Sequence, residues 1–372
     1  MFVFGTLMGL PGALLTLPDV VDGFQLTLAD RGTLIASLFA GLCVGSALSG
    51  PMAEVMGTRR AFIVSSVLVA VCVPLIGLAS GLWSAAAALA AAGIPAAGIN
   101  TTANALVSDA FPEERGHRLA IVSVAVGAGG LAMPAAAAAI AGQFPWTVLV
   151  FGSAVLAAVV AVATFRLEAP ASAAGAHVTL ADTIELLRQP GFASIILLVL
   201  LSAGSDVTMA GWTSTYLMDR GFEPRTAAWA LSSYWFGLIA GRLALSRYVD
   251  RDKAGAMAVG AAACAACVLL LVLSSGALLA VTPFLTGTAI ALLVPTGLAL
   301  GGERFPANTG MVFGVMLTAA QVGATVLPAL VGVVAEAAGL RTAMALLVAN
   351  SIVIVCVALA VARRTHAARP RR

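Results

Sequence analysis

Long apolar runs, separated by short polar turns, dominate this sequence. Runs without Asp, Glu, Lys or Arg include 32–53, 61–108, 119–165, 254–302 and 342–362. A membrane-spanning helix needs about 20 apolar residues, so each of the three longest runs holds a helical hairpin. Their turns are expected near Gly81, Gly142 and Gly276. Continuous apolar runs argue against a membrane β-barrel, in which apolar and polar residues alternate.

The runs together predict an all-α membrane protein with twelve transmembrane helices. The predicted spans are 2–18, 32–53, 61–80, 84–106, 118–141, 146–165, 192–217, 226–246, 254–274, 277–300, 309–334 and 342–362. We expect an N-terminal six-helix bundle at 1–166, a cytoplasmic linker at 167–190, a C-terminal six-helix bundle at 191–364 and a basic tail at 365–372. Thr179–Asp182 resembles a capping box, which predicts a short amphipathic helix in the linker.

Composition supports lipid as the solvent for most of the chain. Hydrophobic residues make up 60% of it and charged residues 10%, whereas a soluble domain carries about 25% charged residues. All five cysteines fall inside predicted spans, where we expect them to pack. The sequence has no G-x-x-x-x-G-K-[ST] and no H-E-x-x-H motif. We therefore expect no cofactor, no metal, no enzymatic reaction and no nucleic-acid partner.

The basic residues are divided unequally between the two sides of the predicted bundle. Sixteen Lys and Arg fall on one side, and four, Arg31, Arg220, Arg225 and Arg341, fall on the other. Because cytoplasmic loops carry the excess of Lys and Arg, both termini are expected in the cytoplasm, with the protein in the plasma (inner) membrane.

A polar turn recurs at a constant spacing along the chain. Asp109–Gly116 reappears 194 residues later as Glu303–Gly310, with Phe, Pro and Gly at matching positions. Gly129 and Pro134 have counterparts at the same offset. Several matches at one spacing indicate an internal duplication. A duplicated unit of six spans keeps its orientation, so the two halves should be related by an axis along the membrane normal.

Two groups of residues carry a resemblance to a known family. Gly50–Arg60 resembles the signature loop between the second and third helices of the major facilitator superfamily. Two further segments resemble its fucose-permease-like sugar branch. They are Asn104–Gly116, and Gly204–Asp206 followed by Trp212 and Gly241–Leu243. The resemblance implies two pseudo-symmetric six-helix bundles around a central cavity. It also implies that the halves rock to expose a substrate site alternately to each side of the membrane.

The sequence departs from that branch at two positions used for sugar and proton handling. Members of the branch carry one acid in the first helix and another in the fourth. Here the first predicted span has no acid, and Asn100 stands at the fourth-helix position. The fifth span has Met133 before Pro134, where drug antiporters carry a glycine. A proton-coupling role must therefore fall on another residue.

Asp206 is the only acid deep inside a predicted span. Placing an Asp at the centre of a membrane helix costs about 2.5–3.5 kcal/mol on insertion scales. Protonation, or a position on a watery cavity, relieves this cost. Asp206 is therefore a candidate contact for a proton or for the substrate. The alternative is a structural hydrogen bond to a neighbouring helix.

Four amide and aromatic groups complete the candidate substrate site together with Asn100. Asn100 and Asn104 share one face of the fourth span, and amides that faced lipid would be unsatisfied. Gln321 stands in the eleventh span. Trp212 and Trp235, in the seventh and eighth spans, are candidates for stacking on a substrate ring. Interhelical adhesion is the alternative for the amides, and anchoring at the membrane interface is the alternative for the tryptophans.

Charged turns at the cytoplasmic ends are candidates for a gate. We expect the turns Glu54–Arg60, Asp109–Arg118 and Asp250–Lys253 to pair when the site opens outward and to part when it opens inward. The candidate gating residues are Glu54, Arg59, Arg60, Asp109, Arg118, Arg242, Asp250 and Arg251. Arg242 either pairs with Asp250 or extends to the cytoplasmic surface.

The sequence thus predicts a monomeric secondary active transporter in contact with membrane lipid. It would move a small polar, sugar-like solute by alternating access, either alone or in symport with a proton. A drug or metabolite exporter of the same fold is the alternative, because sparse charge in the cavity would admit apolar cargo. A membrane sensor that does not transport is a third hypothesis.

Overall fold

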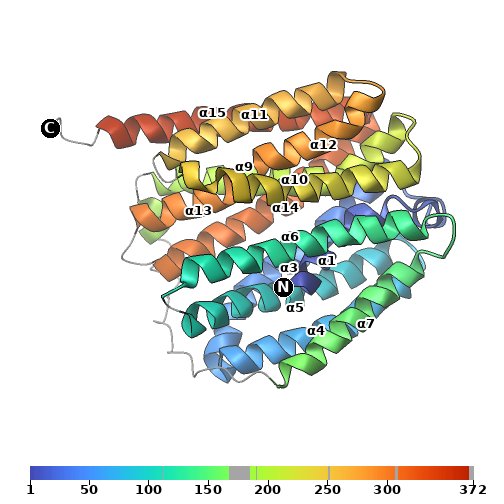
Figure 1. The fold of residues 1–372 in the computed structure, drawn as a ribbon, viewed down its shortest axis with the longest axis horizontal. Helices are drawn as coiled ribbons and strands as arrows, with labels where there is room; N and C mark the ends of the chain where they lie inside the picture. Colours follow the sequence, from blue (N-terminus) through green and yellow to red (C-terminus); the bar gives the residue numbers. More distant parts are fainter. Residues whose placement is uncertain (112, 167–184, 190, 250–251, 306–308, 368–372) are drawn as a thin grey trace.

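The computed structural model describes the chain except for residues 112, 167–184, 190, 250–251, 306–308 and 368–372. Its main helices are α1 (Phe2–Leu14), α2 (Pro18–Val21), α3 (Leu28–Met56), α4 (Thr58–Gly77), α5 (Leu82–Ala110), α6 (Arg115–Ile140), α7 (Thr147–Thr164), α9 (Phe192–Asp219), α10 (Pro224–Val249), α11 (Lys253–Leu273), α12 (Ala277–Ile290), α13 (Leu293–Arg304), α14 (Thr309–Ala338) and α15 (Leu340–Ala367). The long helices run side by side (Figure 1).

The predicted twelve spans are confirmed. Ten helical segments of the described chain are long and apolar enough to cross a membrane, with α12 and α13 counted together as Ala277–Arg304. Helices α1 and α10 complete the twelve: α1 is apolar but short, and α10 carries three arginines along its length. The chain is an all-α integral membrane protein.

The two halves have the same internal contact pattern. In the N-terminal half α1 lies on α6, α3 on α5, and α4 on α7. In the C-terminal half the equivalent pairs are α9 with α14, α10 with α12, and α11 with α15. Figure 1 shows the halves as two adjoining layers, one blue to green and one yellow to red.

Glycines at duplicated positions produce the closest helix contacts. A Cβ on Gly129 would collide with the backbone of α1, and a Cβ on Gly323 would collide with the backbone of α9. Gly41 and Gly45 of α3 lie against the α5 backbone in the same way, and Gly237 and Gly241 of α10 lie against α12. Small residues allow such close backbone approach in lipid, where packing rather than hydrophobicity holds helices together.

Two predicted spans differ from the structure in their bounds, and most of the predicted linker helix lies outside the described residues. The first span, predicted at 2–18, ends at Leu14, and the short α2 follows. The tenth span, predicted as one helix over 277–300, is broken between α12 and α13. In the linker, residues 185–188 are helical, whereas the predicted capping box at Thr179–Asp182 lies outside the described residues.

Hydrogen bonds join the two halves at one end of the bundle. We call the end where α3 meets α4 the basic end, and the other the opposite end. Toward the opposite end, Ser214 of α9 donates to the carbonyl of Gly12 in α1 at 3.0 Å. Toward the basic end, Thr101 of α5 is exposed, and Thr318 of α14 is half-buried with its hydroxyl bonded to the Gly314 carbonyl at 2.9 Å.

Candidate transport site

Asp206 and Tyr234 form a polar pair near the middle of the C-terminal half. Asp206 lies midway along α9, and the Tyr234 hydroxyl of α10 donates to its carboxylate. The same hydroxyl lies 3.0 Å from the Asp206 carbonyl. Tyr234 is fully buried and Asp206 is partly exposed. The carboxyl group therefore has a hydrogen-bond partner on a neighbouring helix.

Asn100 and Asn104 form a second pair, on α5. The Asn104 side-chain amide donates to the Asn100 carbonyl at 2.7 Å and to the Asn100 side-chain oxygen at 3.1 Å. Both residues are half-buried beside the exposed Thr101. Gln321 of α14 is also half-buried. Within the described chain no hydrogen bond joins this amide pair to Asp206, so a solute between them would meet two separate polar walls.

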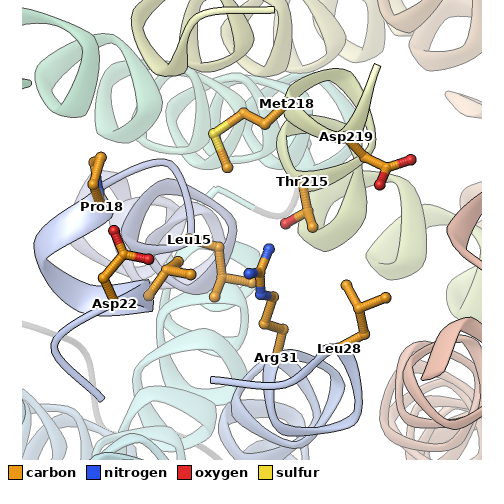
Figure 2. Close-up of a pocket in the computed structure, with 9 residues that line it drawn as sticks. Leu15, Pro18, Asp22, Leu28, Arg31, Thr215, Met218 and Asp219 are labelled. Atoms are coloured by element: carbon orange, nitrogen blue, oxygen red, sulfur yellow. The ribbon is translucent and has the colours of Figure 1, made fainter. Parts of the chain in front are cut away.

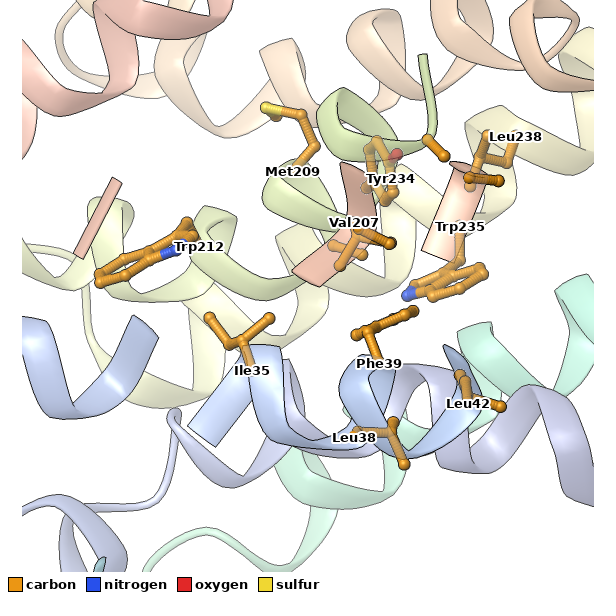
Figure 3. Packing of buried hydrophobic residues seen from close by; sticks show 14 of the residues in the cluster. Ile35, Leu38, Phe39, Leu42, Val207, Met209, Trp212, Tyr234, Trp235 and Leu238 are labelled. Carbon is orange, nitrogen blue, oxygen red and sulfur yellow. The ribbon is translucent and has the colours of Figure 1, made fainter. Parts of the chain in front are cut away.

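Trp235 lies where the two halves meet, next to the polar pair. Its ring lies edge-on to Tyr234, with centroids 6.1 Å apart, and a Cβ on Gly130 of α6 would collide with it. Figure 3 shows Trp235 above Phe39 of α3. The indole N–H is buried without a hydrogen-bond partner among the described residues. These side chains form a buried aromatic cluster where the two halves meet.

Trp212 is placed differently from Trp235. It is fully buried, and its indole N–H donates to the carbonyl of Pro328 in α14 at 3.1 Å. In this conformation Trp212 joins α9 and α14 of the C-terminal half and is enclosed by protein. The sequence made both tryptophans candidates for stacking on a substrate ring, whereas in the structure they have different surroundings.

Glu336 links the halves at the opposite end. Its carboxylate, on α14, accepts from the backbone N–H of Leu28 at 2.9 Å and of Ala29 at 3.4 Å, at the start of α3. The first N–H groups of a helix have no partner within the helix, and their dipole favours an anion. A carboxylate of one half therefore caps a helix of the other half.

A polar cavity of about 470 Å³ lies beside this closure, between the ends of α1, α3 and α9. Arg31 extends into it between Asp22 and Thr215 (Figure 2). The Thr215 hydroxyl and the Arg31 Nε are buried without hydrogen-bond partners among the described residues. Both halves contribute to its walls, so this cavity is a vestibule outside the closed end.

The predicted gating residues lie at the basic end, and several interact within their own half. Arg118 forms a 2.9 Å ion pair with Glu114, and Arg59 donates to the Phe165 carbonyl at 3.3 Å. Lys253 forms a 2.6 Å ion pair with Glu303. The remaining candidates at this end include Glu54, Arg60 and Asp109. Asp250 and Arg251 lie outside the described residues, so the predicted pairing of Arg242 with Asp250 is not described.

Two features of the site were missed from the sequence. The hydrogen bond from the Tyr234 hydroxyl to Asp206 was not predicted. Asn350 of α15 was not considered, yet its side chain donates to Ser205 at 2.7 Å and to the Leu201 carbonyl at 3.0 Å. A general rule could have found Tyr234: an acid in the middle of a span needs a donor at the same depth.

Comparisons with known proteins agree with this architecture. The family described as the Major Facilitator Superfamily matches residues 1–277 and 219–372. No curated protein sequence matches the chain at a significant level.

Three solved structures share the fold over nearly the whole chain. A bacterial homologue of the human lysosomal transporter Spinster, inward-facing and occupied, is 16% identical with a TM-score of 0.79, covering 97% of this chain and 95% of its own. The nucleoside transporter NupG is 13% identical with a TM-score of 0.81, covering 97% of both chains. The human organic anion transporter MFSD10 is 16% identical with a TM-score of 0.69, covering 96% of this chain and 97% of its own.

Proposed function

Because this chain belongs to the Major Facilitator Superfamily and is a transporter rather than an enzyme, we propose that it is a secondary active symporter. It moves a small polar, sugar-like solute together with a proton by alternating access. The basic end faces the cytoplasm of the cell, in line with the excess of Lys and Arg there.

The Asp206–Tyr234 pair is the observation that carries this proposal. An ionised carboxylate at mid-membrane depth is costly, and a proton removes that cost. The partial exposure of Asp206 gives a proton access to the carboxylate. Tyr234 stabilises the ionised form by donating to it. Asp206 thus alternates between a carboxylate held by Tyr234 and a neutral acid able to donate to a solute.

The amides on α5 supply the other side of the proposed substrate site. The Asn104 side-chain amide donates to the backbone carbonyl and the side-chain oxygen of Asn100, so the Asn100 N–H groups and the Asn104 side-chain oxygen can serve a ligand. Sugar hydroxyls need both donors and acceptors, which amides provide without charge. The indole N–H of Trp235, which has no hydrogen-bond partner among the described residues, is a further donor next to Tyr234. This combination favours a neutral polyhydroxylated solute over an anion.

Reconstitution into liposomes tests the proposed function. Thermal-shift measurements on the purified protein should first rank sugars, nucleosides and lipophilic cations as stabilising ligands. The best sugar should then accumulate when an inward proton gradient is imposed, and a protonophore should abolish the accumulation. Stabilisation by lipophilic cations alone would favour the exporter, sugar flux indifferent to the gradient would favour a uniporter, and no flux of any tested solute would favour a sensor.

A further inference from the structure

The break in the tenth span leaves the Ala291 backbone carbonyl without its usual donor. In a continuous helix the Ala291 carbonyl would accept from the N–H of residue 295. Residue 295 is proline, which has no N–H and whose ring clashes with the carbonyl four residues earlier. The helix restarts beyond this point, with the Thr296 N–H bonded to the Leu292 carbonyl at 2.9 Å.

Arg242 of α10 supplies the missing donor from a different helix. Its Nε donates to the Ala291 carbonyl at 3.3 Å. An unsatisfied carbonyl is costly at membrane depth, where no water replaces the lost bond. The guanidinium also stands at the carbonyl end of α12, where the helix dipole favours a cation. The Arg242 side chain therefore supplies both a donor for the Ala291 carbonyl and a positive charge at the end of α12.

The packing of α10 on α12 places Arg242 at the break. A Cβ on Gly241 would stand 2.7 Å from the Cβ of Ala291 and 2.7 Å from the Thr288 carbonyl. Only a residue without a side chain allows this approach, and Arg242 is the next residue along α10. The same helix carries Tyr234, the partner of Asp206. Helix α10 thus connects the break to the proposed coupling pair.

A second proline in the same span shows that this arrangement is particular to Pro295. Pro283 of α12 deprives the Leu279 carbonyl of its donor in the same way. That carbonyl accepts from the Thr282 hydroxyl at 2.8 Å, within its own helix. Pro283 therefore needs no partner from α10 and serves as a matched control.

We propose that Arg242 is a positioning residue that holds the broken tenth span against α10 by satisfying the Ala291 carbonyl. It thereby fixes α13 relative to the Asp206–Tyr234 pair during the transport cycle. The functional part of this inference rests on the proposed transport function, whereas the bond between Arg242 and Ala291 does not depend on the substrate.

Suppression of an Arg242 substitution by a proline substitution tests the inference. Arg242→Met removes the donor and keeps much of the side-chain volume. It should lower the thermal unfolding temperature. It should also reduce the maximal flux by roughly tenfold, with the half-saturation concentration changed less than twofold. Arg242→Lys should retain part of the flux, because an ammonium group can also donate. Adding Pro295→Ala to Arg242→Met restores an N–H at residue 295 and should recover both properties, whereas adding Pro283→Ala should not.

Each result decides between the proposal and its alternatives. Failure of Pro295→Ala to raise the unfolding temperature of Arg242→Met, or an equal rise with Pro283→Ala, overturns the proposed bond. Recovery of the unfolding temperature without recovery of flux overturns the positioning role. If Arg242→Met does not fold, folding of the double variant with Pro295→Ala supports the proposal, and its failure to fold contradicts it. Recovered stability in a protein that moves no sugar contradicts the proposed function and leaves the bond intact.

Discussion

The fourth and tenth spans occupy equivalent places in the two halves, yet they satisfy their polar groups differently. Helix α5 is continuous over Leu82–Ala110, and the Asn104 amide bonds back to Asn100 on the same helix. The tenth span is broken between α12 and α13, and its free carbonyl is bonded by Arg242 of another helix. The amide bond of α5 lies within one helix, whereas the carbonyl of the tenth span is bonded by a side chain from a neighbouring helix.

Two further hydrogen bonds near the proposed site in the C-terminal half also join different helices. In the C-terminal half, Tyr234 bonds Asp206 and Asn350 bonds Ser205, each across two helices. Bonds between helices change when the helices shift, whereas a bond within one helix moves with it as a rigid unit. We infer that recognition of the solute rests on the N-terminal wall and that proton coupling rests on the C-terminal half.

The largest expected effect is at Tyr234. Tyr234→Phe removes the hydroxyl that donates to Asp206, and a hydrogen bond to a charged group contributes about 1.5–3 kcal/mol. Proton-driven accumulation should fall at least about tenfold, while exchange of labelled for unlabelled solute stays within about threefold. Tyr216→Phe is the control, because the Tyr216 hydroxyl accepts from Arg220 near the opposite end. Equal loss of accumulation and exchange would remove Tyr234 from coupling.

An intermediate effect is expected at the amide pair. Replacing Asn100 and Asn104 together by Ala removes uncharged donors and acceptors from the N-terminal wall. The half-saturation concentration should rise about three- to tenfold, since neutral hydrogen bonds contribute about 0.5–1.5 kcal/mol each. The ratio of accumulation to exchange should not change. Thr102→Val is the control, because the Thr102 hydroxyl is buried and bonded to the Gly98 carbonyl. A change in that ratio would place coupling in both halves.

The smallest effect is expected at the closure of the opposite end. Glu336→Gln keeps an acceptor for the N–H groups of α3 but loses the negative charge that favours the helix start. The opposite end should open about two- to fivefold more often, as measured by labelling of Thr215→Cys with a membrane-impermeant thiol reagent. Glu303→Gln is the control, since Glu303 pairs with Lys253 in its own half. Unchanged labelling would mean that Glu336 does not hold the halves together.

The spans and the duplication could be predicted because lipid imposes simple demands on sequence. A spanning helix must be long and apolar, so charge-free runs mark the spans, and Gly129 and Gly323 mark equivalent close contacts. Asp206 was identified for the same reason, because an acid is rare in such surroundings.

The partners of these residues could not be predicted, because they come from distant parts of the chain. Nothing local to Ala291 indicates that Arg242 bonds its carbonyl, and prolines are common in membrane helices that continue through them. The two tryptophans look equivalent in sequence, but only packing decides that Trp212 is buried against Pro328 while Trp235 lies on Gly130. The roles of the basic-end turns stay predictions.

Proton movement coupled to solute movement in Asp206→Asn tests the division of labour most directly. Asn keeps the shape of Asp but cannot bind and release a proton. In liposomes, solute added to the wild-type protein and to the Asn100→Ala, Asn104→Ala variant should drive a measurable pH change. Asp206→Asn should give no pH change and no accumulation, yet exchange labelled for unlabelled solute at near wild-type rates. A solute-driven pH change that persists in Asp206→Asn would contradict the assignment of coupling to this residue.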